Sequence, residues 1–313
     1  MASARSRVST IKYQALLVLA AAVWGLGTVV IKDTVGEFSP SWLVGIRFFS
    51  AGVIACVVFA RRFVRLARAG ALLDHVRAGV VLGLLVAAAY LCNTGGLTDT
   101  TAAKSSFLTG VYCVLVPFIA WGVMRRRPTA FNLVAAFLCL AGVGLVSLPA
   151  ESSFSLGWGD AVTLVSAVFL GFQVVATSKL APGRDMAVLT SLQFLLGGAF
   201  ALVIAAATEL PPEAAVLLDP ATLGNLAYLV VFATCLALLL QNVGLARVSP
   251  SSGALLLSLE SVFGVAFSVL FLGEQLSVAM LVGFALIFCA VLVSEWLPGV
   301  VSGSQSSQTQ ALP

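Results

Sequence analysis

Long apolar runs recur along the whole chain, roughly one in every 30 residues. A helix that crosses a bilayer needs about 20 mostly apolar residues. The runs, bounded by charges, Gly or Pro, occupy residues 12–31, 40–60, 78–97, 101–123, 129–148, 158–178, 186–207, 220–242, 251–272 and 277–296. Lipid offers the backbone no hydrogen-bond partner, and the alternating pattern of a β-barrel is absent. We therefore predict ten transmembrane helices.

Composition excludes most other classes of protein. Only 10% of the 313 residues are charged, 60% are apolar, and the mean hydropathy is +1.08. Soluble domains carry about 25% charged residues. A soluble enzyme, a nucleic-acid-binding protein and a disordered chain are therefore excluded, and the sequence predicts an all-α integral membrane protein with the lipid bilayer as its surroundings.

The positive charges predict the orientation. If the N-terminus is cytoplasmic, 14 of the 17 Lys and Arg residues fall on the inner side: Arg5, Arg7, Lys12, Arg61, Arg62, Arg65, Arg68, Arg77, Arg125, Arg126, Arg127, Lys179, Arg184 and Arg247. Only Lys32 and Lys104 lie toward the outside, and Arg47 lies within the second run. The positive-inside rule thus places both termini in the cytoplasm of a cell inner membrane. The longest inner loop, residues 61–77, is either a topology anchor or a short basic amphipathic helix on the anionic leaflet.

The two halves of the chain resemble each other. Arg47-Phe48 matches Gln193-Phe194 at an offset of 146, and Tyr112 matches Glu260 at an offset of 148. Each repeat therefore holds five spans, and an odd number inverts the second copy, as in secondary transporters. The expected domains are a cytoplasmic segment at 1–11, repeats at 12–148 and 149–296, and a disordered cytoplasmic tail at 297–313.

The last two runs carry a recognisable pattern. Residues 254–295 contain LES-VF, FLGEQLS and GFALI, which closely resemble the last two helices of EamA-type transporters of the drug/metabolite transporter superfamily. Ser261 replaces the usual Pro of that pattern, and residues 100–129 resemble the corresponding helix of the first repeat. The resemblance covers residues 12–296. It implies ten helices, a central cavity lined mainly by helices 1, 3, 4, 6, 8 and 9, and export of amino acids, metabolites or drugs.

Glu260 and Arg47 are charged residues deep within spans. Glu260 lies about 14 Å into its helix, near the bilayer midplane. A carboxylate there marks a site by default, where it binds an amino group or carries a proton; alternatively it is structural and capped by Ser258 or Ser261. For Arg47 we expect a structural role, either pairing with a carboxylate such as Glu260 or bracing unwound carbonyls.

Other polar residues fall on the expected cavity helices. Lys104 either snorkels to the outer headgroups or binds a substrate carboxylate. Trp24 is deep enough to wall the cavity, and Pro117 is a candidate hinge because it removes a backbone hydrogen bond. The remaining candidates for substrate binding or coupling are Tyr112, Tyr90, Asn93, Gln173, Gln241 and Asn242. Each is individually as compatible with contacts between helices, but together they predict an amphiphilic pocket.

Several activities lack the residues they need. The chain has no G-x-x-x-x-G-K-[ST] motif for ATP, and His75 is its only histidine. A Ser-His hydrolase would lack its base within the membrane, because His75 lies in an inner loop. The six cysteines lie within apolar runs without a CxxC spacing. We expect no enzyme, cofactor or metal site.

The sequence therefore predicts a secondary-active or facilitative transporter that exports a small metabolite, an amino acid or a drug-like amphiphile, by alternating access. Protons are a candidate coupling ion, with Glu260 as their carrier. An importer or exchanger and, less favoured, a channel are the alternatives. Gly79-x-x-x-Gly83 permits tight helix contact, either within a monomer or in a weak homodimer.

Overall fold

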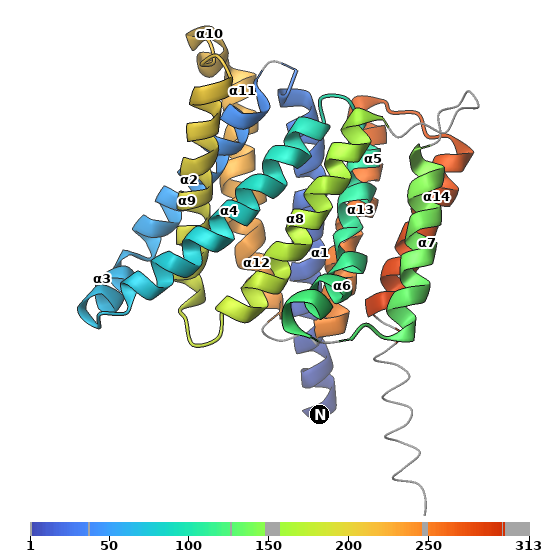
Figure 1. Ribbon diagram of the computed structural model, residues 1–313, viewed down its shortest axis with the longest axis horizontal. Helices are drawn as coiled ribbons and strands as arrows, with labels where there is room; N and C mark the ends of the chain where they lie inside the picture. The colour runs from blue at the N-terminus through green and yellow to red at the C-terminus, as the bar shows by residue number, and fades with distance from the viewer. Residues whose placement is uncertain are drawn as a thin grey trace, which may run out of the picture.

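A computed structural model describes residues 2–36, 38–125, 127–147, 157–245, 250–295 and 297. Within those ranges, the side chains of 2–10, 146–147, 242, 245, 250–255, 258 and 295 are outside the description. The described backbone is helical, with short connections and no strand (Figure 1). This is the arrangement that satisfies backbone hydrogen bonds without water.

The helices follow the apolar runs closely. The first half forms α1 (Ala2–Thr34), α2 (Pro40–Val58), α3 (Ala60–Arg68), α4 (Leu72–Gly96), α5 (Ala102–Gly110), α6 (Tyr112–Met124) and α7 (Ala130–Ser147). The second half forms α8 (Trp158–Leu180), α9 (Met186–Thr208), α10 (Ala214–Leu218), α11 (Pro220–Ala227), the π-helix η1 (Tyr228–Leu236), α12 (Ala237–Leu245), α13 (Pro250–Leu272) and α14 (Val278–Glu295).

In the described part of the chain, seven helices are long and apolar enough to cross a membrane. Three further apolar helices of 10–17 residues lie at Ala130–Leu145, Leu259–Leu272 and Val278–Ser294. Together they cover the ten expected runs, although length and composition alone qualify only the seven. The protein is a multi-pass membrane protein.

The segment 61–77 differs from a simple loop. Its first part is the helix α3, and α4 already begins at Leu72, so the connection between them shrinks to three residues. Gly70 turns the chain there with φ +70°, a left-handed conformation that glycine adopts without strain. Of the two possibilities for this segment, the helical one is confirmed as secondary structure.

Equivalent helices of the two halves pack against each other. α2 packs on α9 and α7 on α14, and these two pairs stand at opposite ends of the molecule in Figure 1. α1 packs on α13, and its equivalent α8 packs on α5 and α6, which are the equivalents of α13. α8 also runs in the opposite direction to α1 in Figure 1. The halves thus form two related units of opposite direction.

Glycines allow the closest of these helix contacts. A Cβ atom at Gly52 of α2 would lie 2.4 Å from the Leu195 nitrogen of α9. A Cβ atom at the equivalent Gly198 would lie 2.1 Å from the Phe49 nitrogen of α2. Only glycine permits such an approach of two backbones. The contact is reciprocal because the two positions are equivalent in the repeats.

The Gly79 and Gly83 face of α4 is used within the chain. Gly79 lies against the Leu192 side chain, and a Cβ at Gly83 would lie 2.9 Å from the Gly197 nitrogen. Both glycines are buried against α9. The tight contact that this motif predicts is therefore made inside the monomer and leaves no such face for a homodimer.

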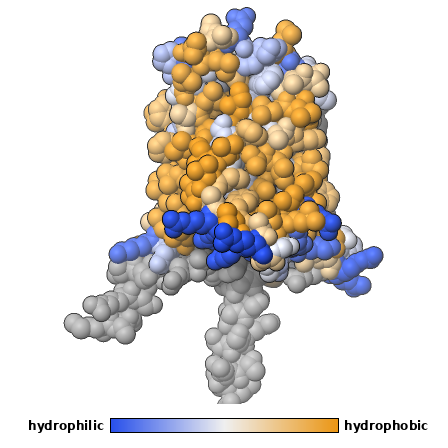
Figure 2. Space-filling view, turned by 90° about the vertical axis from the view of Figure 1, so that its left-hand side faces the viewer, coloured by the Kyte–Doolittle hydropathy of each residue, from blue (hydrophilic) through white to orange (hydrophobic). Residues whose placement is uncertain are grey.

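An apolar belt surrounds the molecule. Figure 2 shows a broad hydrophobic surface, with hydrophilic residues gathered mainly toward its two ends. Large apolar side chains are exposed on this surface, among them Val57 at 71%, Phe137 at 75% and Leu140 at 69%. Soluble monomers rarely expose so large a continuous apolar surface. The belt is suited to contact with lipid chains.

The Gly52 contact yields a stability test. We expect Gly52→Ala to lower the free energy of unfolding by about 1–3 kcal/mol, because the added methyl forces α2 and α9 apart. Gly122→Ala is the matched control, since nothing lies within 4 Å of a Cβ at that helical position. Thermal unfolding in detergent measures both variants. Equal stability of the two would contradict the close α2–α9 contact.

Candidate functional site

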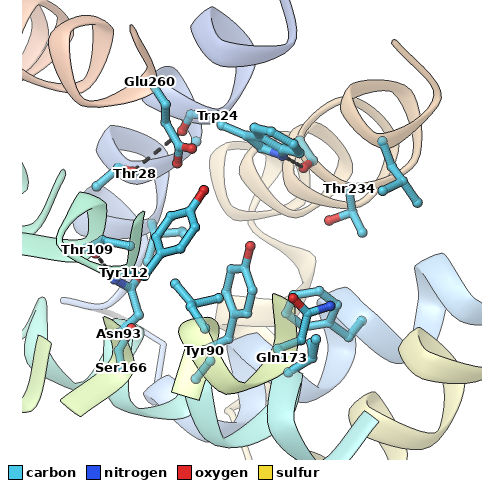
Figure 3. Close-up of a pocket in the computed structure, with 18 of the residues that line it drawn as sticks. Trp24, Thr28, Tyr90, Asn93, Thr109, Tyr112, Ser166, Gln173, Thr234 and Glu260 are labelled. Atoms are coloured by element: carbon cyan, nitrogen blue, oxygen red, sulfur yellow. Dashed lines mark hydrogen bonds between the residues drawn. The ribbon is translucent and has the colours of Figure 1, made fainter. Parts of the chain in front are cut away.

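A cavity of about 220 Å³ lies between the two halves of the protein (Figure 3). It is lined by α1, α2, α4, α5, α6, α8, α9, η1, α12 and α13. These include the six helices that the family resemblance implies, joined by the second helix of each repeat. The described lining of this cavity includes no residue of α7 or α14, which pair at one end of the molecule.

Equivalent positions of the two repeats face this one cavity. The lining pairs are Thr28 with Gln173, Arg47 with Gln193, Phe48 with Phe194, Tyr90 with Leu238, Asn93 with Gln241, Thr109 with Leu257, and Tyr112 with Glu260. The framework is thus symmetric, but the charges are not. The guanidinium comes from the first repeat and the carboxylate from the second, and each has a neutral equivalent.

Arg47 is held by the interrupted helix of the second repeat. Its side chain is buried, with the residue 4% exposed, and its Nε donates to Oγ1 of Thr234 at 2.9 Å. Its Nη2 lies 3.5 Å from the Ala233 carbonyl, and the guanidinium faces the rings of Phe48 and Tyr90 at 5.1 and 5.3 Å. Of the expected roles, it therefore contacts a carbonyl of unwound helix.

The π-helix η1 explains why such a donor is needed. In a π-helix each N–H pairs with the carbonyl five residues earlier, as Ala237 does with Phe232. Where the α-helical spacing of four resumes in α12, the next carbonyl, that of Ala233, is skipped and needs another donor. Thr234 follows the π-helical spacing and also donates its hydroxyl to the Leu229 carbonyl at 2.8 Å. The indole Nε1 of Trp24 donates to the Ala233 carbonyl at 2.8 Å. Side chains of α1 and α2 therefore both donate hydrogen bonds to the same turn of η1.

Glu260 projects into the cavity. Among the described residues, none donates a hydrogen bond to its carboxylate, and no ion pair within 4.0 Å joins it to Arg47. In Figure 3 its carboxylate and the hydroxyls of Tyr112 and Tyr90 point into the same space. A buried carboxylate in this position is available to bind a positively charged or hydrogen-bond-donating ligand.

Two buried serines of the lining were not singled out by the sequence. Ser106 is 6% exposed and Ser166 is fully buried, and neither hydroxyl has a hydrogen-bond partner among the described residues. Unpaired buried hydroxyls are unfavourable, so a polar ligand or water would complete them. Gln193 was also missed, although its alignment with Arg47 was a usable signal. Nothing in the local sequence distinguishes either serine from serines that bond to their own helix.

The other sequence candidates divide into three groups. Tyr90, Asn93, Gln173, Gln241 and Trp24 all line the cavity, and Nδ2 of Asn93 donates to Thr109 at 2.8 Å. The side chain of Asn242 is outside the described residues. Lys104 does not line the cavity.

Lys104 pairs with a buried carboxylate instead. Its Nζ lies 3.3 Å from Oδ2 of Asp160, a residue only 3% exposed, and Thr100 donates its hydroxyl to the other oxygen of that carboxylate. This pair joins α5 to the first turn of α8. The sequence gave no indication of this contact, which spans 56 residues.

Pro117 lies inside α6, but the interruption of this span is elsewhere. α5 ends at Gly110 and α6 begins at Tyr112, so the break falls at Val111, six residues before the proline. The amide of Val111 donates to Leu108, three residues earlier, which tightens the chain at that point. Any hinge at this break is displaced from the proline toward Tyr112.

Comparisons with known proteins agree with this architecture. Residues 11–148 and 157–296 each match the EamA-like transporter family. The chain is 30% identical over 281 residues to an uncharacterized transporter of Archaeoglobus fulgidus, covering 88% of this chain and 83% of that protein. It is 24% identical over 211 residues to an uncharacterized transporter of Methanothermobacter thermautotrophicus, covering 64% and 59%. One solved crystal structure superposes with a TM-score of 0.63 at 18% identity, over 91% of this chain and 96% of that one, a likeness of fold alone.

The fastening of η1 can be tested at Thr234. Thr234→Val keeps the shape of the side chain but removes the acceptor for Arg47 and the donor to Leu229. We expect the free energy of unfolding to fall by about 1–3 kcal/mol, the cost of leaving buried polar groups unpaired. Thr208→Val is the control, since its hydroxyl bonds to Ile204 on the exposed surface. If both variants unfold alike, Arg47 does not depend on Thr234.

Proposed function

The chain belongs to the EamA-like transporter family, and we propose that it moves a small metabolite through its central cavity by alternating access. In such a cycle, two inverted halves exchange conformations and one site opens to each side in turn. The observation that carries this proposal is that equivalent positions of both repeats line a single cavity. Export is the direction that the resemblance implies.

The proposed arrangement in the membrane has ten spans with both termini in the cytoplasm. The repeats then occupy 12–148 and 149–296, flanked by the cytoplasmic segment 1–11 and the tail 297–313. The plasma membrane is the proposed location. This arrangement is supported by the positive residues, since α3 and the α6–α7 and α8–α9 connections lie at one end of the molecule in Figure 1. The proposed assembly is a monomer or a weak homodimer.

The proposed substrate carries an amino or other cationic group beside an organic body. Glu260 would bind that group, since its carboxylate has no partner among the described residues. Trp24 and Tyr90 present aromatic surface to the same space, which favours contact with cations and with apolar groups. An amino acid and a drug-like amphiphile both meet this description. Lys104 is not part of this proposal, because its ammonium group forms an ion pair with Asp160.

The driving force is either the gradient of the substrate or an exchange with protons. In proton exchange, Glu260 would hold the proton on one half of the cycle and the substrate on the other. A carboxylate that serves both ligands in turn links their movements, because binding of one excludes the other.

Reconstitution in liposomes tests the function and the role of Glu260 together. We expect saturable flux of at least one amino acid or cationic dye from a labelled panel, stimulated by substrate on the opposite side. Glu260→Gln should lower this flux at least tenfold, because the carboxylate contributes a charge-assisted contact worth about 1.5–3 kcal/mol. Glu213→Gln, outside the cavity at the start of α10, should leave the flux unchanged.

The results separate the alternatives. Flux that does not saturate and shows no stimulation from the opposite side would mean a channel and would overturn alternating access. Flux that ignores an imposed pH gradient would mean a facilitator. Full activity and an unchanged pH response of Glu260→Gln would remove this residue from both binding and coupling. Counterflow in each direction separates an importer or exchanger from an exporter.

A further inference from the structure

The helix α3 is a largely exposed amphipathic segment with the sequence ARRFVRLAR. None of its residues is buried. Arg61, Arg65 and Arg68 follow one another at spacings of four and three residues and so share one face of the helix. Phe63 and Leu66 lie on the opposite side. Such a helix, with an arginine face and an apolar face, is typical of segments that lie in a membrane interface.

The position of α3 agrees with such a location. In Figure 1 it projects at one side and one end of the helix bundle, next to the start of α4. Figure 2 looks at the molecule from that side and shows a row of strongly hydrophilic residues along the edge of the apolar belt. The side chains of Arg62 and Arg65 are 49% and 72% exposed. The arginines of α3 therefore lie at the level where lipid headgroups begin.

The charge of α3 is only partly neutralised by the protein. Asp185, in the α8–α9 connection, lies 3.1 Å from Nη1 of Arg62 and 3.5 Å from Nη2 of Arg65. In the ranges that the structure describes, Arg61 and Arg68 have no acidic partner within 4.0 Å. Asp185 thus pairs with two of the four arginines of α3. The helix therefore keeps an excess of positive charge toward the membrane.

Asp185 is held in place as well as ionised. Its carboxylate accepts hydrogen bonds from the amides of Ala187 and Val188 at the start of α9. Its own amide donates to Nε2 of His75 at 3.0 Å. Burial tends to raise the pKa of Asp185, but the Arg62 hydrogen bond and these two amides outweigh it and lower the pKa below its usual value. The carboxylate therefore stays in place as a counterion between the two halves.

We propose that α3 binds anionic phospholipid headgroups, with Arg61 and Arg68 as the lipid contacts and with Asp185 as an internal competitor for Arg62 and Arg65. The guanidinium group matches a phosphate with paired hydrogen bonds, and each basic residue at a membrane surface strengthens binding to anionic lipid. The apolar face, with Phe63 and Leu66, turns toward the acyl chains. A lipid phosphate that takes Arg62 from Asp185 loosens a contact between the first and second repeats.

Lipid retention by the full chain tests this inference. The purified protein is equilibrated with equal amounts of phosphatidylglycerol and phosphatidylcholine, and the bound lipids are counted by native mass spectrometry. We expect the wild type to retain phosphatidylglycerol preferentially. Arg61→Gln with Arg68→Gln should weaken that preference about fivefold for each arginine removed. Higher salt should weaken it further by screening.

Two other variants sharpen the result. Asp185→Asn keeps a residue that caps α9 well but releases Arg62 and Arg65, so phosphatidylglycerol retention should rise. Arg125→Gln with Arg127→Gln removes two exposed arginines from the α6–α7 connection at the same end of the molecule, and retention should not change.

Three outcomes would overturn the inference: no preference for phosphatidylglycerol in the wild type, the same loss in both double variants, or no gain in Asp185→Asn. If α3 binds an acidic protein partner instead of lipid, the wild type would show no preference for phosphatidylglycerol. The experiment measures lipid retention and not flux. A failure of the lipid-binding inference is therefore independent of any failure of the transport proposal.

Discussion

A peptide carbonyl within a bilayer must find its hydrogen-bond donor inside the protein. Regular helices meet this requirement along most of the chain, and the arrangement around the cavity follows from the place where regularity ends. In η1 the wider turn presents the Ala233 carbonyl to two donors from the other repeat, the indole of Trp24 and the guanidinium of Arg47. The buried positive charge is thus accommodated by irregular backbone, and the irregular backbone is stabilised by that charge. Glu260 remains free of this network and faces the cavity.

The symmetry of the framework and the asymmetry of its charges have different physical origins. Helix pairing is set by glycine contacts and side-chain shape, which both repeats retain at Gly52 and Gly198. Cavity chemistry is set by single side chains, which the repeats do not share at Arg47 and Gln193 or at Tyr112 and Glu260. Two inverted copies therefore supply a common scaffold, while substitution of a few residues within it gives the cavity one cation and one anion.

Hydropathy alone predicted most helix ends to within a few residues, because the bilayer fixes both the length and the polarity of a span. The exceptions include the starts of α1 and α4, which lie ten and six residues before their runs, at Ala2 and Leu72. The repeat offset also indicated which polar residues share the cavity, including Tyr112 and Glu260. The π-helix could not be predicted, since YLVVFATCL reads as an ordinary apolar helix and its widening depends on donors from α1 and α2. The pairing of Lys104 with Asp160 was likewise hidden, because it depends on how α5 meets α8 and not on local sequence. The charge pattern predicted that the segment containing α3 is positively charged, but it did not predict how exposed the side chains of α3 are.

The contact between α2 and α9, like that between α7 and α14, joins equivalent helices of the two repeats, which most other helix contacts do not. Gly52 meets Leu195, and Gly198 meets Phe49, so that each contact is the repeat equivalent of the other. By comparison, Gly25 of α1 meets Gly264 of α13, and the equivalent contact involves different helices, α8 and α6. In any cycle that exchanges the conformations of the halves, the α2–α9 crossing maps onto itself. A contact present equally in both states contributes nothing to the equilibrium between them. In the proposed cycle the crossing would be energetically neutral to the direction in which the cavity opens, and contacts that differ between the states, such as those of α1 and α8, would set that balance.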